Sequence, residues 1–201
     1  MPFDHNDHYH RLLLRRVPAG ARHALDVGCG TGRFARRLAE RGLAVDAVDP
    51  SAEVIAEATA RSGPAGPRFV RADVTTMELP VGRYDFVSCL ASIHHVPFGT
   101  VARLRETLAP GGVLAILGCY RERTPADYAW ALAAVPVNAA ARLAVGAADR
   151  LGGRSAPPKA PVRAADLSLP EIRRRTAELL PGATVRRLLF WRYLLVYRAA
   201  P

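Results

Sequence analysis

The residues with the clearest chemical meaning are three glycines in the stretch ALDVGCGTG, namely Gly28, Gly30 and Gly32. Glycine lets the backbone turn sharply out of a strand and lets a ligand lie against the main chain. An apolar strand precedes these glycines, a helical pattern follows over residues 31–41, and Asp49 closes the next apolar strand. A glycine loop between a strand and a helix, followed by an acid at the end of the next strand, predicts a nucleotide-type cofactor site.

Two histidines are a second candidate for chemistry. His94 and His95 follow the fourth predicted strand, so they should reach the same edge of a parallel sheet as the glycine loop. A histidine at that edge could act as a general base near neutral pH. It could also do no more than shape the loop through hydrogen bonds, and both interpretations stay open.

Two groups of side chains have metal-ligand chemistry without the spacing of a metal site. One is a crowded N-terminal cluster made of His5, Asp7, His8, Tyr9 and His10. The other consists of the three cysteines, Cys29, Cys89 and Cys119, which fall at strand ends and are expected to be small buried apolar residues. We therefore predict no metal, and we expect the N-terminal segment to fold over the cofactor with Tyr9 or His10 at the pocket.

Strand and helix patterns alternate along the chain and would position these residues. The predicted strands cover residues 24–27, 44–49, 68–72, 84–90 and 113–117. The predicted helices cover residues 9–16, 31–41, 52–61 and 100–108. Residues 109–112 (APGG) predict a turn into the fifth strand. Ser168 and Glu171 form a capping box that opens a helix through residue 180, and residues 183–198 predict two antiparallel strands that meet near Trp191 and Arg192.

These elements predict an α/β fold with a Rossmann-like, doubly wound sheet. Near-continuous apolar strands separated by helices indicate a parallel sheet that is covered on both faces. With the terminal hairpin, the predicted sheet has seven strands and is mostly parallel with a C-terminal antiparallel hairpin. Asp46 lies inside the second strand and is expected to point to the wetter side of the sheet. A length of 201 residues predicts a single domain, residues 1–201.

Five motifs occur in order between about residues 20 and 120 and resemble those of one family. They are Asp26-x-Gly28-x-Gly30-x-Gly32, Asp49, Ala72-Asp73-Val74, Tyr84-Asp85-Phe86-Val87 and Leu108-Ala109-Pro110-Gly111-Gly112. Together they resemble the class I S-adenosylmethionine-dependent methyltransferases, in particular the small-molecule branch with type 11/25-like domains. A site for NAD would instead carry the fingerprint GxGxxG, whereas this chain has GxGxG directly behind an acid.

The resemblance implies S-adenosylmethionine as the cofactor and a role for each matching residue. The glycine loop would lie against the methionine end, with Asp26 near the ammonium group. Asp49 would accept hydrogen bonds from the ribose hydroxyls, and Asp73 from the adenine amine; ionised carboxylates suit both tasks. Each of these two acids could instead cap the following helix or turn. The predicted cofactor-binding residues are Asp26, Gly28, Gly30, Gly32, Asp49, Asp73, Val74 and Leu90, and the candidate catalytic residues are His94 and His95.

Two segments outside these motifs are expected to complete the site. Residues 1–20 would form an N-terminal cap, and residues 118–165 an insertion over the acceptor pocket. Tyr128 and Trp130 give this insertion an aromatic content that suits a small organic acceptor. An ordinary amphipathic helix on the sheet is the alternative for the same stretch.

The formal charge of +10 raises the question of a nucleic-acid partner. Because the arginines are scattered and Lys159 is the only lysine, a solvated basic surface is the favoured interpretation. We therefore predict methyl transfer to a small organic acceptor, with an RNA methyltransferase or a cofactor-binding protein without transferase activity as alternatives. The chain has no apolar run of membrane-helix length, no signal-peptide pattern and an odd number of cysteines, so we expect a cytoplasmic protein without a membrane partner.

Overall fold

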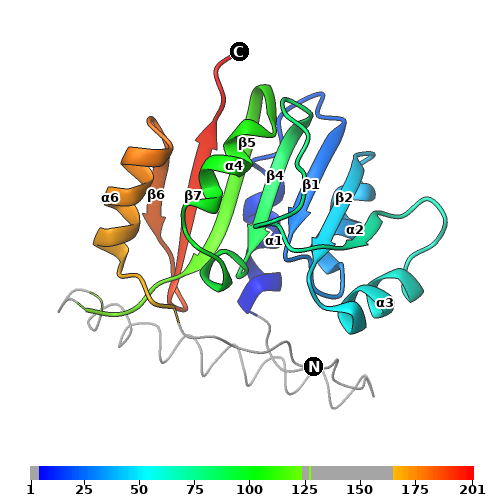
Figure 1. The fold of residues 1–201 in the computed structure, drawn as a ribbon, viewed down its shortest axis with the longest axis horizontal. Helices are drawn as coiled ribbons and strands as arrows, with labels where there is room; N and C mark the ends of the chain where they lie inside the picture. The colour runs from blue at the N-terminus through cyan, green and yellow to red at the C-terminus, as the bar shows by residue number, and fades with distance from the viewer. Residues whose placement is uncertain (1–4, 124–126, 128–164) are drawn as a thin grey trace.

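The computed structural model describes residues 5–123, Asp127 and residues 165–201. Its strands are β1 (His23–Val27), β2 (Ala44–Asp49), β3 (Arg68–Arg71), β4 (Tyr84–Leu90), β5 (Leu108–Cys119), β6 (Thr184–Arg187) and β7 (Arg192–Arg198). They form a 7-stranded sheet in the order β3-β2-β1-β4-β5-β7-β6 (Figure 1). The first five strands pair in parallel, and β7 runs antiparallel to both β5 and β6. The predicted mostly parallel sheet with a C-terminal antiparallel hairpin is confirmed.

Helices cover both faces of this sheet (Figure 1). They are α1 (His5–Leu14), α2 (Arg33–Ala39), α3 (Ala52–Ala60), the 3-10 helix η1 (Ile93–His95), α4 (Thr100–Glu106) and α6 (Leu169–Leu179). The helix α2 is shorter at both ends than predicted. Gly32 before it has φ 73, and this left-handed conformation prevents a right-handed helix from beginning at Thr31.

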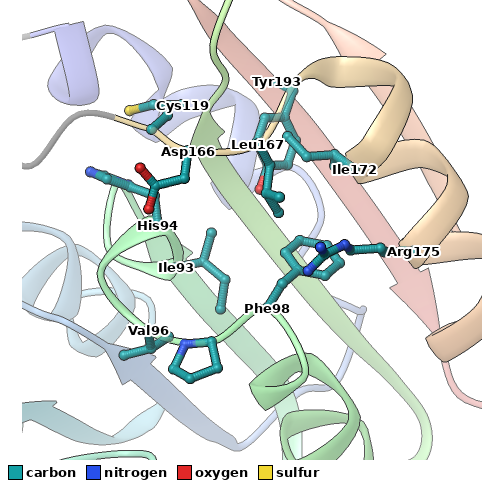
Figure 2. A pocket seen from close by; sticks show the side chains of 12 residues that line it. Ile93, His94, Val96, Phe98, Cys119, Asp166, Leu167, Ile172, Arg175 and Tyr193 are labelled. Atoms are coloured by element: carbon teal, nitrogen blue, oxygen red, sulfur yellow. The ribbon is translucent and has the colours of Figure 1, made fainter.

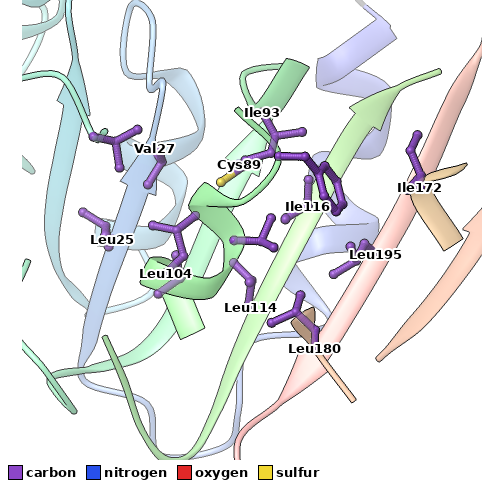
Figure 3. Packing of buried hydrophobic residues seen from close by; sticks show 14 of the residues in the cluster. Leu25, Val27, Cys89, Ile93, Leu104, Leu114, Ile116, Ile172, Leu180 and Leu195 are labelled. Carbon is purple, nitrogen blue, oxygen red and sulfur yellow. The ribbon is translucent and has the colours of Figure 1, made fainter. Parts of the chain in front are cut away.

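The apolar side chains form one core on each face of the sheet. In β5, Leu114 and Ile116 pack under α4 and α6, whereas Val113 and Ala115 pack under α1 and α2. Figure 3 shows the first of these cores, which Leu104 of α4 and Ile172 of α6 complete. Because side chains alternate along a strand, a strand buried on both faces must be apolar throughout, which explains the unbroken apolar run of β5.

The predicted turn at residues 109–112 is wrong. This stretch lies within β5, where Leu108 pairs with Tyr84 and Val113 pairs with Phe86, so the register shifts between the two pairs. A Cβ atom at Gly112 would lie 2.8 Å from the carbonyl oxygens of Ala109 and Tyr84. The glycine therefore permits a bulge inside the strand, where the same residue types had predicted a turn before it.

The expectation that Asp46 faces the wetter side of the sheet is also wrong. Its side chain is only 12% exposed and accepts hydrogen bonds from the Tyr84 hydroxyl at 2.8 Å and from Arg68 Nε at 2.7 Å. Burial raises the pKa of Asp46, but the hydrogen bonds from Arg68 and Tyr84 lower it by a larger amount. The pKa of Asp46 therefore lies below its ordinary value. Asp46 is a structural acid that connects β2 to β3 and β4.

The N-terminal helix α1 packs against the sheet and the terminal hairpin. Leu13 is fully buried, and the Tyr9 hydroxyl donates a hydrogen bond to the Leu189 carbonyl oxygen at 2.9 Å. Within the described part of the chain, every helix is too short or too polar to cross a membrane. Most of the predicted insertion over residues 118–165, with Tyr128 and Trp130, lies outside the described residues.

Candidate active site

The glycine loop joins β1 to α2 at the carboxyl edge of the sheet. Gly28, Gly30 and Gly32 have φ values of 68, 53 and 73, which favour glycine. A methyl group at Gly28 would overlap the Ser92 side chain, and one at Gly32 would overlap the Phe69 ring. At Gly30 a Cβ would meet nothing within 4 Å. Gly28 and Gly32 therefore permit close packing, whereas Gly30 leaves its main chain open to a ligand.

Asp49 lies at the end of β2 and contacts this loop. Its Oδ2 accepts a hydrogen bond from the Gly30 backbone N–H at 3.1 Å, and its Oδ1 accepts one from the Ser51 N–H at 3.0 Å. The N-cap of α3 is Ser51, whose hydroxyl accepts from the Val54 N–H at 3.4 Å. Since a carboxylate has about four lone-pair sites, Asp49 retains the capacity to bind two ligand hydroxyls.

Asp26 is the buried acid beneath the glycine loop. It is 2% exposed, and its Oδ1 accepts a hydrogen bond from the Ser88 hydroxyl at 2.7 Å. Burial raises the pKa of Asp26 to about 7; the Ser88 bond lowers it and the nearby Asp49 raises it. A cation bound beside this carboxyl would favour its ionised form, so Asp26 is suited to a ligand with an ammonium group.

Asp73 begins the exposed turn after β3. Its Oδ1 accepts hydrogen bonds from the Thr75 N–H at 2.8 Å and the Thr75 hydroxyl at 2.7 Å, and these bonds lower its pKa. The Val74 side chain is buried, and its carbonyl oxygen accepts a hydrogen bond from Arg103 Nη1 at 2.8 Å. Arg103 also donates to the carbonyl oxygens of Thr75 and Met77. The sequence analysis missed this arginine, because nothing in α4 indicates which turn it reaches.

The chain after β4 borders both the glycine loop and a hollow. Leu90 ends the strand half-buried, and the Ser92 hydroxyl donates to the Val27 carbonyl oxygen at 2.6 Å, which holds η1 against β1. Within η1, His94 is half-buried and His95 is exposed, with ring centroids 4.2 Å apart. The linking role of Ser92 is a second feature that the sequence analysis missed.

The hollow lies between η1, the end of β5, β7 and the start of α6 (Figure 2). Its volume is about 190 Å³, and its walls combine apolar side chains with polar groups. The polar groups that line it come from His94, Cys119, Asp166, Arg175 and Tyr193. The sequence analysis placed His94 and Cys119 at this edge but not the other three, which later segments of the chain bring there.

The cysteines are thiols in apolar surroundings. Burial is the largest cause that raises the pKa values of Cys29, Cys89 and Cys119 above their ordinary range. All three are free of disulfide bonds. Among the residues that the structure describes, no group of three or more His, Cys, Asp or Glu side chains could hold a metal ion.

The comparisons with known proteins agree with this geometry. Residues 25–116 match the family described as "Methyltransferase domain". An uncharacterized methyltransferase of Mycobacterium tuberculosis is 39% identical over 205 residues, which cover 98% of each chain. The chain belongs to the class I S-adenosylmethionine-dependent methyltransferases.

Two further relatives of this methyltransferase are informative. A ubiquinone biosynthesis O-methyltransferase of Xanthomonas axonopodis is 36% identical over 140 residues, which cover 66% of this chain and 55% of the relative. The magnesium protoporphyrin IX methyltransferase of Synechocystis, solved with bound S-adenosylhomocysteine, has a TM-score of 0.61 at 18% identity over 97% of this chain and 81% of the other. This last likeness shows the fold alone.

S-adenosylmethionine is the cofactor of this methyltransferase, as predicted, and the NAD alternative is rejected. The residues of the site fit that group. The open main chain at Gly30 leaves room beside the loop, and Asp49 and the buried Asp26 offer acceptors for hydroxyl and ammonium groups.

Proposed function

We propose that this methyltransferase transfers the cofactor's methyl group to a small organic acceptor. The observation that carries the proposal is the hollow beside His94, beyond the carboxyl ends of β4 and β5. Ligands of open α/β sheets bind at this edge. A volume of about 190 Å³ with apolar and polar groups in its walls suits a small molecule or one end of a larger one.

The cofactor, when bound, supplies a methyl group activated by its sulfonium. The chain's own residues would then bind and orient the reactants. In this proposal Asp26, Asp49 and Asp73 bind the ammonium, ribose and adenine groups, with Leu90, Val74 and the glycine loop supplying the remaining surface. His94 faces the hollow and would take a proton from the acceptor, whereas His95 is exposed and would support the loop.

The arginines do not favour RNA as the acceptor. Several of them bind the protein's own carbonyl oxygens and carboxylates instead of forming an open basic groove. Examples are Arg36 to Thr31, Arg41 to Leu14, Arg105 to Leu179, Arg61 to Glu57 and Arg174 to Glu178. These five arginines are engaged within the fold, which supports the small-molecule proposal over the RNA alternative.

We also propose that residues 1–20 and 118–165 close the site within a single domain of residues 1–201. The packing of α1 through Tyr9 and Leu13 supports the first part. We further propose a cytoplasmic location, which the three free cysteines support because thiols persist in a reducing compartment.

The cofactor roles are tested by replacing Asp49 with alanine. We expect Asp49→Ala to weaken S-adenosylhomocysteine binding at least about tenfold, or roughly 1.4 kcal/mol, in calorimetry. Glu53→Ala is the matched control, because Glu53 is an exposed acid in the first turn of the adjacent α3 and should leave the affinity unchanged. Equal affinity of Asp49→Ala and the unmodified protein would remove the ribose assignment.

The acceptor class is tested by incubating the protein and radiolabelled cofactor separately with small metabolites and with bulk RNA. Label in a small molecule supports the proposal, and label only in RNA rejects it. His94→Gln should slow transfer about tenfold or more while calorimetry shows unchanged S-adenosylhomocysteine binding. Full activity of this variant would exclude His94 as the base.

A further inference from the structure

Tyr193 lines the hollow beside His94 with a side chain that the protein encloses almost completely. The residue is 1% exposed, and it lines the hollow together with residues of η1 and α6. Figure 2 shows its side chain directed into this space. No described residue forms a hydrogen bond with the Tyr193 hydroxyl. A hydroxyl that borders a hollow and has no protein partner is available to a ligand that enters there.

The fold makes specific room for this tyrosine. A methyl group at Gly118 of β5 would overlap the Tyr193 ring and its hydroxyl, so only glycine permits the ring to lie where it does. Burial raises the pKa of Tyr193 well above its ordinary value, with smaller contributions from Cys119 and Cys89. The group therefore remains a neutral hydroxyl, which can donate a hydrogen bond to a ligand oxygen.

Arg175 of α6 lines the same hollow. Its guanidinium forms neither a hydrogen bond nor an ion pair with any residue that the structure describes, and Figure 2 shows it directed toward Phe98. The positive charge of Arg175 interacts with the carboxylate of Glu171, which lies one turn earlier in α6. The carboxylate of Glu171 already accepts hydrogen bonds from the Ser168 N–H and hydroxyl, and lies 3.9 Å from Arg123.

The two ends of the hollow carry different polar groups. His94 and Asp166 lie at the end opposite Arg175 (Figure 2). Between these ends the wall is apolar and includes Ile93, Phe98, Leu167 and Ile172. A ligand that fits this order has an anionic oxygen at one end and an apolar middle, because guanidinium and phenol groups both donate to oxygen.

We propose that the hollow binds a small carboxylic acid, whose carboxylate accepts hydrogen bonds from the Arg175 guanidinium and the Tyr193 hydroxyl. The apolar part of the acid packs against Phe98 and Ile172, and its far end reaches His94. This inference rests on the proposed function in one respect, namely that the bound acid is the methyl acceptor. Tyr193 and Arg175 are then positioning residues that select the acceptor by its charge.

A titration that needs no turnover tests the proposal. The probe is 4-fluorobenzoate, observed by fluorine NMR on the full chain saturated with S-adenosylhomocysteine, and the neutral probe is 4-fluorobenzamide. We expect the unmodified protein to bind the acid about tenfold more tightly than the amide, because a charge-assisted pair with arginine is lost in the amide. Equal binding of the two probes would overturn the proposal.

Three variants assign the effect to the two residues. Arg175→Gln should remove the preference for the acid, and Tyr193→Phe, which keeps the packing of the ring, should weaken binding of the acid about threefold to tenfold. Arg173→Gln is the matched control, because Arg173 is an exposed arginine of the same helix and does not line the hollow. A preference that Arg175→Gln leaves unchanged would contradict the proposal.

The failure of this inference and the failure of the proposed function are distinguishable. If small neutral molecules are methylated and the two probes bind equally, the carboxylic-acid inference is wrong and the function stands. If label appears only in RNA, the function is wrong, whereas the probe titration still shows whether the hollow selects a carboxylate. Thermal unfolding and S-adenosylhomocysteine affinity, both expected to stay unchanged, show that each variant is folded.

Discussion

The two sides of the active site are built in different ways. The cofactor side, between β1 and β3, depends on backbone: left-handed glycines, a carboxylate bound to the Gly30 N–H and a turn held by Arg103. The proposed acceptor side, between β4 and α6, depends on side chains that line a hollow. A backbone site tolerates few residue types, whereas a side-chain site can change its ligand by substitution. The comparison shows why a shared cofactor is compatible with different acceptors.

The two sides also differ in how they place charge. On the cofactor side, Asp26 is an acid buried under the loop with a raised pKa. On the acceptor side, Arg175 is a half-buried base at the edge of an apolar hollow. The buried acid is sensitive to pH in the physiological range, while arginine keeps its charge at every relevant pH. Substitutions on the two sides should therefore have different consequences.

The largest expected effect is that of Gly28→Ala on the cofactor side. The new methyl group overlaps Ser92, and the backbone at φ 68 disfavours alanine. We expect the free energy of unfolding to fall by about 3 kcal/mol, measured by urea unfolding. Because the loop must move, S-adenosylhomocysteine affinity should fall more than about tenfold in calorimetry.

Gly42→Ala separates the backbone contribution from the packing contribution. Gly42 has φ 85, and a Cβ there would meet nothing within 4 Å. We expect Gly42→Ala to lower the free energy of unfolding by about 1 kcal/mol and to leave the cofactor affinity unchanged. If Gly28→Ala and Gly42→Ala lower the free energy of unfolding equally, then the close packing at Gly28 adds nothing to the cost of its backbone conformation.

The next effect concerns Asp26 and pH. Its pKa rises from 3.8 to about 7 in the folded protein, chiefly through burial, so the folded state binds a proton more tightly than the unfolded state. This stabilisation is present below about pH 4 and is lost as the pH rises through about 7. We expect urea unfolding to show a decrease in the free energy of unfolding over that range that is absent in Asp26→Asn.

Cofactor binding should depend on the same group with the opposite sign. Protonated Asp26 cannot attract an ammonium group, so S-adenosylhomocysteine affinity should rise with pH up to about 7 and be flat in Asp26→Asn. Asp85→Asn is the control: burial raises the pKa of Asp85, but N–H donors of His23 and Arg22 lower it overall. The contribution of Asp85 to the free energy of unfolding is lost as the pH falls, and a contribution of Asp26 to that free energy with the same direction would contradict the assignment.

The smallest expected effects come from removing one helix cap on each side of the active site. Ser168→Ala removes the hydroxyl that binds Glu171 at the start of α6, and Ser51→Ala removes the N-cap of α3. Each should lower the free energy of unfolding by about 1 kcal/mol. Only Ser51→Ala should weaken S-adenosylhomocysteine binding, roughly twofold to threefold, because the Ser51 N–H donates a hydrogen bond to the Asp49 carboxylate. Equal effects on cofactor affinity would show that the two sides are coupled.

Much of the cofactor side could be predicted because its signals are local. The bounds of β2 and β4 agree with the prediction at both ends, and the capping box of Ser168 and Glu171 is where the residue pattern placed it. Errors occurred where one residue pattern has two structural solutions. The APGG stretch permits a bulge as well as a turn, and Asp46 could face solvent or a buried tyrosine.

The amino-acid sequence by itself determined the order of strands and helices, the glycine loop and the acids beside it, because each depends on residues close together in the chain. Only the tertiary structure decided that Asp26 is buried with Ser88, that Arg103 holds the turn after β3, and that Tyr193 and Arg175 meet at one hollow. The physical reason is that these contacts join distant segments. Their side chains carry no local pattern until the sheet and its covering helices bring them together.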